Sequence, residues 1–365
     1  DLTVPFARFV TEREQSLVFP LKRYQIQSAW RGERPQEGRY REFIQADADV
    51  VCRGNLPLQY DIELPGMLVD ILDGFPIPKV CVRVNNRKVM DGFFQALQIE
   101  DPTSAMRLVD KLPKLGEEKT QALLEELVGA EKAKLILSLC QITTPDTSFV
   151  EQVQALGVSS ETMEEGVAEL AAVIAGNQGK REGSIVADLS IARGFDYYTG
   201  TVYEGFLEGL ENVGAVCSGG RYNDLVAQNS KGKLKLPGIG VSIGVTRILG
   251  ILMGRGLLKA SRATPSCVMI ALNDNDSYPQ AVQVATSLRS RSIPCEIFDE
   301  PKKFGEQIRY ANRKGIPYVW FCNADEHGGT THEIRDLQVG EQQPVDLESW
   351  QPDPDRLHPR VVAVE

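Results

Sequence analysis

The stretch YQIQSAWRGERPQEGRYREFIQADADVV, residues Tyr24 to Val51, decides the fold because residues alternate in character on both sides of a loop. The first face of this alternation carries Tyr24, Ile26, Ser28, Trp30, Ile44, Ala46, Ala48 and Val50. The opposite face carries Gln25, Gln27, Ala29, Arg31, Arg41, Gln45, Asp47 and Asp49. Period-two alternation around a loop with Pro35 and Gly38 predicts an antiparallel hairpin. We expect the first face to lie in a core and the second to be a polar floor, with arginine at its entrance.

Length and charge bound the class of protein. A chain of 365 residues can hold two or three domains. It contains no run of eighteen apolar residues, so no membrane span is expected. The start, DLTVPFARFV, lacks the basic and apolar regions of a signal peptide. The formal net charge of -10 argues against nucleic-acid binding by bulk charge, but it permits a local basic surface for a structured RNA.

Cysteine and histidine usage excludes several chemistries. The 7 cysteines stand singly with no CxxC pair, which predicts reduced thiols, a cytoplasmic compartment and no structural zinc site. All 3 histidines follow residue 320, so the first three hundred residues hold no histidine-based triad. We therefore expect no metal ligands from the protein.

Four segments differ in pattern along the chain. Residues 1–100 resemble strands with a few helices, and DLTVPFAR, with Asp1, Thr3 and Arg8, is either the polar end of a strand or a set of ligand contacts. Residues 101–183 show helical spacing and predict an all-α insertion, after which strand-like sequence resumes over 184–258. In residues 264–365, the apolar runs CVMIAL, PCEIFD and PYVWFC alternate with two helical segments, which predicts a compact α/β module with a mostly parallel sheet.

The two helical segments of this module hold the densest basic cluster in the chain. Its members are Arg289, Arg291, Lys302, Lys303, Arg309, Arg313 and Lys314. We expect these side chains to add affinity for RNA through phosphate contacts.

Three arginines in separated segments each have a glycine nearby: Arg31, Arg193 in ARGFDYYTGTVYEG, and Arg247 in PGIGVSIGVTRILGILM. Arg247 is the only charged residue from Gly238 to Met253, so either a ligand or an internal acid must meet it. The chain has no P-loop, so arginine side chains would have to hold a phosphate. Gly219 and Gly220 in CSGGRYNDLV would let the backbone lie flat against a planar ligand.

With Gln45 and Asp49 on the floor, these arginines predict a pocket for a polyphosphate at one end and a small cationic or polar group at the other. The paired Tyr197 and Tyr198 are either core anchors or a source of hydroxyls for the ligand. Phosphoryl or nucleotidyl transfer by charge stabilisation, without a protein nucleophile, fits this set.

These stretches resemble the signatures of histidyl-tRNA synthetases, which are class II aminoacyl-tRNA synthetases. The hairpin is similar to their second class motif, ARGFDYYTGTVYE to their histidine-specific signature, and GIGVSIGVTRIL to their third class motif. CSGGRYNDL and the final module, with EIRDLQVGEQ, are also similar. The resemblance covers essentially the whole chain. It implies an α+β fold: an antiparallel-sheet catalytic domain in two parts (1–100 and 184–258), the helical insertion (101–183), and a C-terminal α/β anticodon-binding domain (264–365).

The resemblance also implies an activity and its residues. The activity is ATP-dependent conversion of L-histidine to histidyl-adenylate, with Mg²⁺ bound with ATP, followed by transfer to tRNA(His). The implied catalytic residues are Arg31 and Arg193, both at the α-phosphate. The implied histidine contacts are Asp1, Thr3 and Gln45 for the amino group, Asp49 and Tyr198 for the imidazole, and Tyr197 alongside. The implied ATP contacts are Arg31, Glu33, Arg39 and Arg247, and Gln36 is expected at the tRNA acceptor end.

Other functions stay open at this stage. A non-catalytic paralogue acting as a histidine-sensing regulatory subunit is the main alternative, although such paralogues typically lack the C-terminal domain and the signature arginine, which Arg193 supplies here. An RNA-binding module of a larger regulator, or a synthetase for another amino acid, are further alternatives. The family's first class motif, which builds a homodimer interface, is expected before DLTVPFAR, and we expect a homodimer of the full-length protein. Asp1 and Asp49 stand where the family commonly has glutamate.

Overall fold

The structure is a computed structural model that describes residues 2–194, 197–226, 234–324 and 330–364. The chain forms two compact units, residues 1–255 and 256–365. Within the described residues, no helix is long and apolar enough to cross a membrane.

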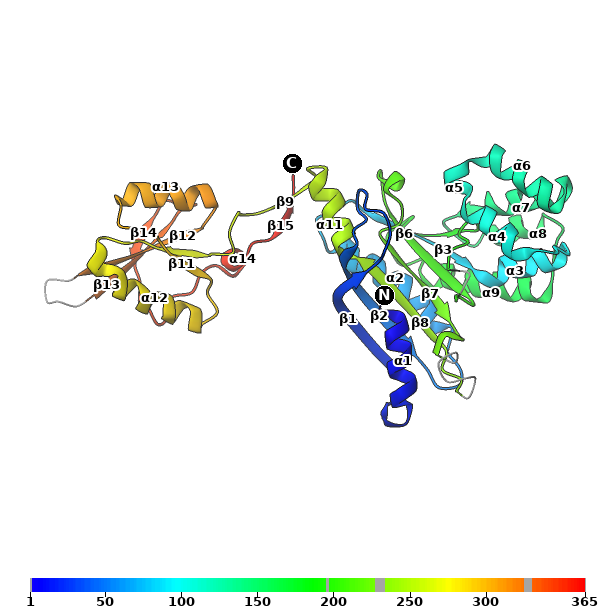
Figure 1. Cartoon of the computed structure of the whole chain (residues 1–365), viewed down its shortest axis with the longest axis horizontal. Helices are drawn as coiled ribbons and strands as arrows, with labels where there is room; N and C mark the ends of the chain where they lie inside the picture. Colours follow the sequence, from blue (N-terminus) through cyan, green and yellow to red (C-terminus); the bar gives the residue numbers. More distant parts are fainter. Residues whose placement is uncertain (1, 195–196, 227–233, 325–329, 365) are drawn as a thin grey trace. The chain divides into compact units, whose positions relative to one another are not determined.

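The first unit is built on a mixed sheet whose described strands number eight, in the order β1-β2-β8-β7-β6-β3-β5-β4 (Figure 1). In chain order they are β1 (Leu21–Trp30), β2 (Glu42–Val51), β3 (Val80–Asn86), β4 (Thr143–Thr144), β5 (Ile185–Asp188), β6 (Thr201–Leu207), β7 (Cys217–Tyr222) and β8 (Gly238–Gly244). Every neighbouring pair is antiparallel except β3 and β5. The predicted hairpin is confirmed as β1 and β2, with Gln27 opposite Gln45 and Arg23 opposite Asp49.

Helices cover the sheet unevenly. The helices of this unit are α1 (Thr3–Arg13), α2 (Gln59–Asp73), α3 (Arg87–Ala96), α4 (Pro102–Asp110), α5 (Leu112–Leu115), α6 (Glu117–Val128), α7 (Ala130–Cys140), α8 (Phe149–Gln154), α9 (Glu161–Gly176) and α11 (Val245–Gly254). Helix α2 packs on β3, β5 and β8, and α11 packs on β2. The polar residues of β2 lie on the sheet face opposite α2, because Arg221 of β7 points to α2 while its neighbour Tyr222 points to Asp49.

The burial expected for the two faces of the hairpin is wrong in its outer part. Tyr24, Ile26 and Trp30 on the expected core face are 80%, 64% and 62% exposed. Asp47 and Asp49 lie deep in the polar floor, each 4% exposed, and the arginine of that face, Arg31, is exposed. The reason is that the helices do not cover this edge of the sheet. Helix α2 packs on strands beyond β2, and no described element covers the outer face of β1.

The segment DLTVPFAR does not form a strand. Residues Thr3–Arg13 form α1, with Ala7 and Val10 fully buried one helical turn apart. They pack in one cluster with Val51 of β2 and Tyr222 of β7. Helix α1 therefore covers one end of the polar sheet face.

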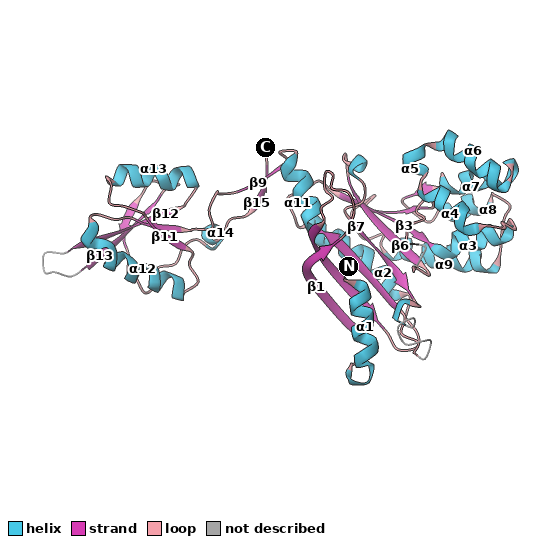
Figure 2. Cartoon of the chain, viewed as in Figure 1, coloured by secondary structure: helices cyan, strands magenta, loops and turns pink. Residues whose placement is uncertain are grey.

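Residues 101–183 are mainly helical, but they are not all-α as expected, because they include the short strand β4. Helices α4 to α7 gather at one end of the unit (Figure 2). Strand β4 pairs with β5 and so extends the main sheet. Helix α9 packs on α3, where a Cβ on Gly92 would lie 2.3 Å from the backbone nitrogen of Met163. The 101–183 boundaries of the insertion stay a prediction.

The second unit contains a sheet in the order β11-β10-β12-β13-β14. Its elements are β10 (Val268–Ile270), α12 (Tyr278–Ser290), β11 (Cys295–Ile297), α13 (Phe304–Lys314), β12 (Tyr318–Ala324), β13 (Thr330–Asp336), β14 (Gln342–Pro344) and α14 (Pro354–Leu357). Strands β11, β10 and β12 are parallel as expected, whereas β13 and β14 add antiparallel strands. A separate pair, β9 (Leu258–Ala260) and β15 (Val361–Ala363), joins the two ends of the unit.

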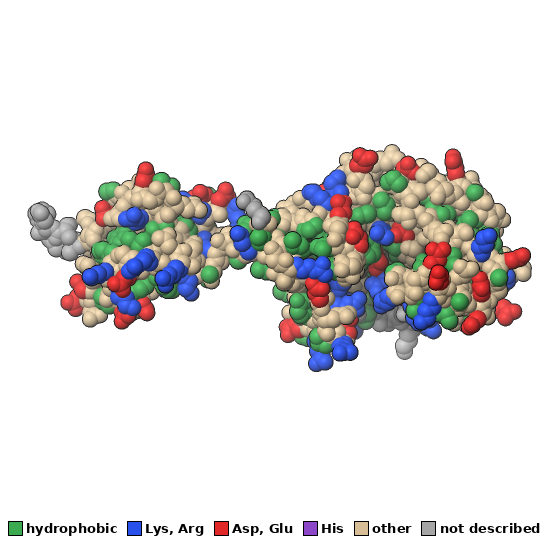
Figure 3. All heavy atoms as spheres, turned by 90° about the horizontal axis from the view of Figure 1, so that it is seen from above, with side chains coloured by type: hydrophobic (Ala, Val, Ile, Leu, Met, Phe, Trp, Pro, Cys, Tyr) green, Lys and Arg blue, Asp and Glu red, His purple; other side chains and the backbone are tan. Residues whose placement is uncertain are grey.

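The basic residues of this unit do not form one cluster. Val268 and Ile270 pack with α12 while Met269 packs with α13, so the two helices lie on opposite faces of the sheet. Arg291 of the α12 side donates to the backbone oxygens of Leu347 and Trp350, which is a structural role. Lys and Arg side chains gather on the visible face of the unit (Figure 3). The α13 segment contributes exposed Arg309 and Arg313.

Candidate active site

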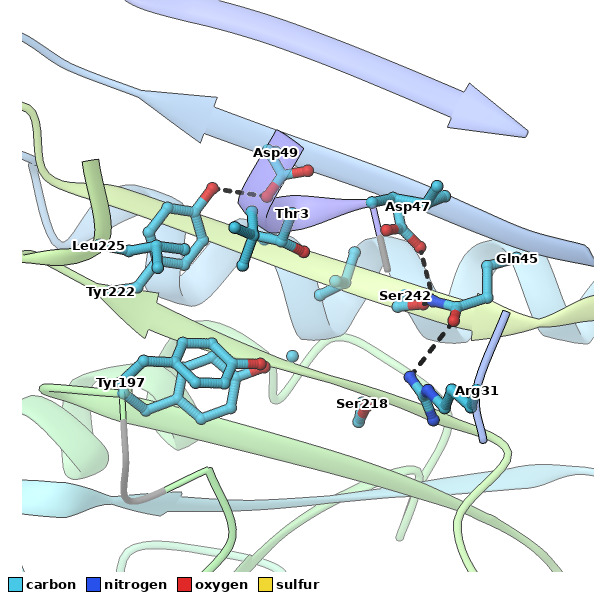
Figure 4. A pocket seen from close by; sticks show the side chains of 16 residues that line it. Thr3, Arg31, Gln45, Asp47, Asp49, Tyr197, Ser218, Tyr222, Leu225 and Ser242 are labelled. Atoms are coloured by element: carbon cyan, nitrogen blue, oxygen red, sulfur yellow. Dashed lines mark hydrogen bonds between the residues drawn. The ribbon is translucent and has the colours of Figure 1, made fainter. Parts of the chain in front are cut away.

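A cavity of about 360 Å³ lies on the polar face of the large sheet (Figure 4). It is lined by Leu2, Thr3, Val4, Arg31, Gln45, Asp47, Asp49, Tyr197, Tyr198, Ser218, Gly219, Tyr222, Leu225, Gly240, Val241 and Ser242. These residues come from α1, the hairpin, the tyrosine pair and strands β7 and β8. Segments some two hundred residues apart in the chain therefore build one site.

The floor of the site is a polar row that crosses four neighbouring strands. Asp47 on β2 is opposite Ser242 on β8, Ser242 is opposite Ser218 on β7, and Ser218 is opposite Glu204 on β6. Directly opposed residues in an antiparallel sheet point to the same face. Carboxylates thus stand at both ends of the row, with two hydroxyls between them.

Gln45 connects this row to Arg31. Its side-chain oxygen accepts a hydrogen bond of 3.3 Å from Nη2 of Arg31. Its amide nitrogen donates to Asp47, at 3.2 Å, and to the hydroxyl of Ser242. The Arg31 guanidinium also lies 5.1 Å from the ring centre of Phe43. The contacts fix the amide orientation of a buried Gln45 and hold Arg31 at the cavity edge.

Asp49 is a buried carboxylate with two partners. The hydroxyl of Tyr222 donates to its Oδ1, and Arg23 lies 2.8 Å from its Oδ2. Burial raises the pKa of Asp49 to about 6, while Arg23 and the Tyr222 hydrogen bond oppose the rise and Asp47 adds to it. The opposite position on β8 is Gly240, where a Cβ would lie 2.1 Å from Oδ1. Only glycine leaves room for this carboxylate.

Tyr197 and Tyr198 form the wall across from the hairpin. Their ring centres are 4.3 Å apart. A Cβ on Gly220 would lie 2.9 Å from the Tyr198 ring, so that ring is the planar group that the glycine accommodates. Burial raises the pKa of both phenols. Both hydroxyls therefore stay protonated near neutral pH.

A second cavity of about 270 Å³ adjoins the first and contains Arg193. Tyr197, Tyr198, Ser218 and Gly219 line both cavities. Nη1 of Arg193 donates to Glu204 at 3.2 Å, at the end of the polar row. Burial raises the pKa of Glu204, and Arg193 opposes that rise. The arginine therefore stabilises a charged carboxylate on the floor.

Arg247 on α11 has no acid to pair with among the described residues. Nη2 donates to the backbone oxygen of Val213, and Nη1 donates weakly to that of Gly38 at 3.4 Å. Burial lowers its pKa, and the charges of Arg39, Arg193 and Arg31 lower it further. No internal salt bridge meets it in the described part of the chain, in contrast to the alternative left open by the sequence. Arg247 therefore lies near other cations, and the charge of Glu33 offsets their effect only in part.

The hairpin loop is held by contacts within itself and with α11. Glu33 and Arg39 form an ion pair of 3.1 Å. Gln36 is exposed, and its backbone exchanges two hydrogen bonds with that of Arg39. Gly38 has a φ of +66°, and a Cβ there would collide with Ile251 of α11. The turn thus leaves Gln36 exposed while Gly38 packs against α11.

The predicted residues fall into three places. Thr3, Arg31, Gln45, Asp49, Tyr197 and Tyr198 line the larger cavity. Arg193 lines the adjoining one, and Glu33, Gln36, Arg39 and Arg247 lie in the loop and on α11. Asp1 lies outside the described residues.

Other residues of the site had no separate prediction: Asp47, Asp110, Glu204, Ser218, Tyr222 and Ser242. Asp47 could have been chosen, because it shares the alternation of Gln45 and Asp49. The others carry no local signal: cross-strand register places Glu204, Ser218, Tyr222 and Ser242, and the packing of α4 places Asp110.

Arg221 in CSGGRYNDL is not a phosphate ligand. It points to the far face of the sheet and forms an ion pair with Asp61 of α2. Its Nη2 also donates to the backbone oxygen of Leu56 at 3.0 Å, and Thr201 donates to Asp61. This buried group joins α2 to β6 and β7.

Comparison with known proteins agrees with this geometry. The family model for histidyl-tRNA synthetase matches residues 1–248, and a model for an anticodon binding domain matches residues 266–350. The chain is 48% identical to the histidine–tRNA ligase of Micrococcus luteus, over 100% of this chain and 80% of the relative. It is 45% identical to that of Cutibacterium acnes, over 99% and 81%. The crystal structure of histidyl-tRNA synthetase from a Nostoc species superposes with a TM-score of 0.82 at 36% identity, covering 94% of this chain and 80% of that one.

The antiparallel sheet, the arginine-lined site and these matches define a class II aminoacyl-tRNA synthetase. The chain belongs to the histidyl-tRNA synthetase family. The expected α+β fold class with a C-terminal anticodon-binding domain is confirmed.

The regulatory alternative is not favoured. A structure described as an ATP phosphoribosyltransferase regulatory subunit/histidyl-tRNA synthetase from Bacillus halodurans superposes with a TM-score of 0.65, but at 18% identity this likeness shows the fold alone. The relatives from Micrococcus luteus and Cutibacterium acnes, at 48% and 45% identity, are histidine–tRNA ligases.

Proposed function

We propose that the larger cavity binds L-histidine, that the surrounding arginines bind ATP, and that the two react there to form histidyl-adenylate. The placement of Arg31 and Arg193 in the lining of the two adjoining cavities carries this proposal. The charges of Arg31, Arg39 and Arg193 also act on the half-buried Arg247. Partly desolvated guanidinium groups whose charges repel one another bind phosphate strongly, because the anion relieves that repulsion. The adjoining polar floor supplies the amino-acid site.

Histidine would lie between the hairpin and the tyrosine wall. Asp49 would accept a hydrogen bond from one imidazole nitrogen and the hydroxyl of Tyr198 would engage the other, with Tyr197 alongside. Thr3 and Gln45 would hold the amino group, with Asp1 as a further contact. Gln45 supports this role because its side chain is already held by Arg31, Asp47 and Ser242 and needs no reordering on binding.

ATP would lie across the arginines. Arg31 and Arg193 would contact the α-phosphate from two sides, Arg247 would hold the distal phosphates, and Glu33 and Arg39 would frame the nucleotide. No group of three or more His, Cys, Asp or Glu in the described residues could hold a metal ion. Magnesium is therefore proposed to arrive coordinated by the phosphates of ATP.

The reaction needs no protein nucleophile. The carboxylate of histidine attacks the α-phosphorus, a carboxylate–phosphorus bond forms, and the bond to pyrophosphate breaks. Negative charge builds on the α-phosphate oxygens as this happens, and the fixed guanidinium groups of Arg31 and Arg193 stabilise it. A ribose hydroxyl of the terminal adenosine of tRNA(His) then attacks the histidyl carbonyl, and AMP leaves.

Exposed residues suggest where tRNA and a second copy of the chain would bind. Gln36 at the loop tip would approach the tRNA acceptor end, and the second unit, which matches an anticodon binding domain, would bind the tRNA elsewhere. The exposed apolar face formed by Tyr24, Ile26 and Trp30 supports a homodimer, because packing against additional protein would remove it from water. We place this activity in the cytoplasm.

Histidine-dependent exchange of label between pyrophosphate and ATP tests the proposal. Wild-type protein should catalyse exchange with L-histidine and not with the other amino acids, and Arg31→Ala should lower the rate strongly. Tight histidine binding without any exchange would instead indicate a sensor and overturn the proposal.

A further inference from the structure

Arg193 is held by two carboxylates that belong to different parts of the first unit. Glu204, on β6 of the sheet, accepts from Nη1 at 3.2 Å. Asp110, the last residue of α4, lies 3.5 Å from Nε. Asp110 also lines the smaller cavity with Arg193 and Glu204. It is thus the one described residue of the 101–183 segment in the lining of either cavity.

Helix α4 presents Asp110 to the site in a defined way. Asp101 caps the helix start by accepting from the backbone nitrogen of Ser104, and Pro102 occupies the first turn. Met106 and Val109 are buried, which fixes the rotation of the helix about its axis. Asp110 then stands at the C-terminal end, where the helix dipole disfavours a carboxylate. A cation must offset this arrangement, and Arg193 is the cation in contact.

The geometry also shows what the two acids achieve together. The side chain of Arg193 is about half exposed, at 52%, so a single contact would leave it several rotamers. Contacts at Nη1 and Nε fix the plane of the guanidinium. Among the described residues, the hydrogen bond of the Arg193 guanidinium is made by Nη1 and not by Nη2.

We propose that Asp110 is a positioning residue for Arg193, through which the helical insertion orients the guanidinium for the activation step. This inference rests on the proposed role of Arg193 at the α-phosphate. Asp110 touches neither substrate. It acts by holding Nε while Glu204 holds Nη1, so that Nη2 is kept ready for the phosphate as charge develops there.

The test is a double-mutant cycle on the full chain, measured as pyrophosphate exchange and as single-turnover formation of adenylate. Asp110→Ala should lower kcat about tenfold, as expected when one charge-assisted contact is lost, with the KM values for ATP and histidine changed less than twofold. In an Arg193→Ala background, Asp110→Ala should have no further effect on the rate. Asp101→Ala, which removes an acid from the other end of α4, is the matched control and should leave the rate unchanged.

Each other outcome is decisive. An equal loss from Asp110→Ala in both backgrounds would mean that the residue only supports the insertion, which overturns the inference. No loss in the wild-type background, while Arg193→Ala still cripples exchange, overturns the inference and leaves the role of Arg193 intact. No loss from Arg193→Ala itself overturns both. If Asp110→Ala unfolds, the isosteric Asp110→Asn takes its place with the same expectations.

Discussion

The hydroxyl of Tyr222 donates a 2.5 Å hydrogen bond to Oδ1 of Asp49, linking β7 to β2 beneath the larger cavity. Both residues are buried, and β8 lies between their strands. The bond lowers the pKa of Asp49 and so opposes the effect of burial. Tyr222 thereby keeps Asp49 oriented and closer to its charged form, which is the form that accepts a hydrogen bond from imidazole.

Removal of this hydroxyl should weaken histidine binding specifically. We expect Tyr222→Phe, like Tyr198→Phe and Asp49→Ala, to raise the KM for histidine about tenfold or more, because a buried hydrogen-bond partner is lost. The KM for ATP should change little. Tyr310→Phe in the second unit, which loses a hydroxyl bonded to Glu296, is the control. Equal effects on both substrates would contradict the assignment.

Asp49 should also give a distinct pH dependence of stability. Its pKa of about 6 in the folded state is above the ordinary aspartate value of 3.8. Between pH 4 and 6 the folded state therefore retains a proton that the unfolded state has lost. Its contribution to the free energy of unfolding therefore falls as pH rises through this window. The stability of wild type relative to Asp49→Asn should drop by on the order of 2–3 kcal/mol from pH 4 to pH 7. Urea unfolding across this range measures it, and a constant difference would refute it.

Replacement by methionine should affect stability much more at the buried Arg221 than at the half-buried Arg247. Arg221→Met leaves the fully buried Asp61 without its ion-pair partner and should cost about 3–5 kcal/mol of folding stability. Arg247→Met removes a cation with no acid partner in the described residues and should change stability by about 1 kcal/mol or less. Arg247→Met should raise the KM for ATP. Thermal unfolding and exchange kinetics distinguish the two, and a large stability loss from Arg247→Met would argue for a structural role.

Arg193 and Gln36 should affect different chemical steps. Arg193→Ala should reduce pyrophosphate exchange by at least about 10²-fold with little change in ATP affinity, because it acts on developing charge. Gln36, exposed at the tip, should affect only the step that involves tRNA. Gln36→Ala should spare exchange and slow aminoacyl transfer. Equal losses in exchange and transfer would place the tip at the nucleotide instead.

Removal of residues 256–365 should impair charging of tRNA but not adenylation of histidine. This cut follows the boundary between the compact units, and it removes both β9 and β15, which pair with each other. Histidine adenylation should persist, whereas charging of tRNA should fall and lose part of its salt dependence. Loss of adenylation from a truncated protein with unchanged circular dichroism would show that the second unit supports activation.

The sequence by itself determined the hairpin, the helical insertion and the α/β module, because each depends on the periodicity of a continuous segment. It also placed Arg31, Arg193, Arg247, Gln45 and Asp49 in motifs that the family shares. The sequence did not determine which face of the hairpin is buried. Alternation separates two faces, but it does not show which face a distant helix covers. Tyr24 and Trp30 are exposed for that reason.

Only the tertiary structure decided which residues meet across the sheet. Asp47, Ser242, Ser218 and Glu204 form one row because β2 pairs with a strand nearly two hundred residues later, and that register depends on the packing of the whole unit. The same long-range pairing sends Tyr222 to Asp49 and its neighbour Arg221 to Asp61. Asp110 reaches Arg193 because the insertion folds back on the sheet. Non-local contacts of this kind leave no pattern in a continuous stretch of sequence, because the residues next to each partner do not depend on which distant residue it contacts.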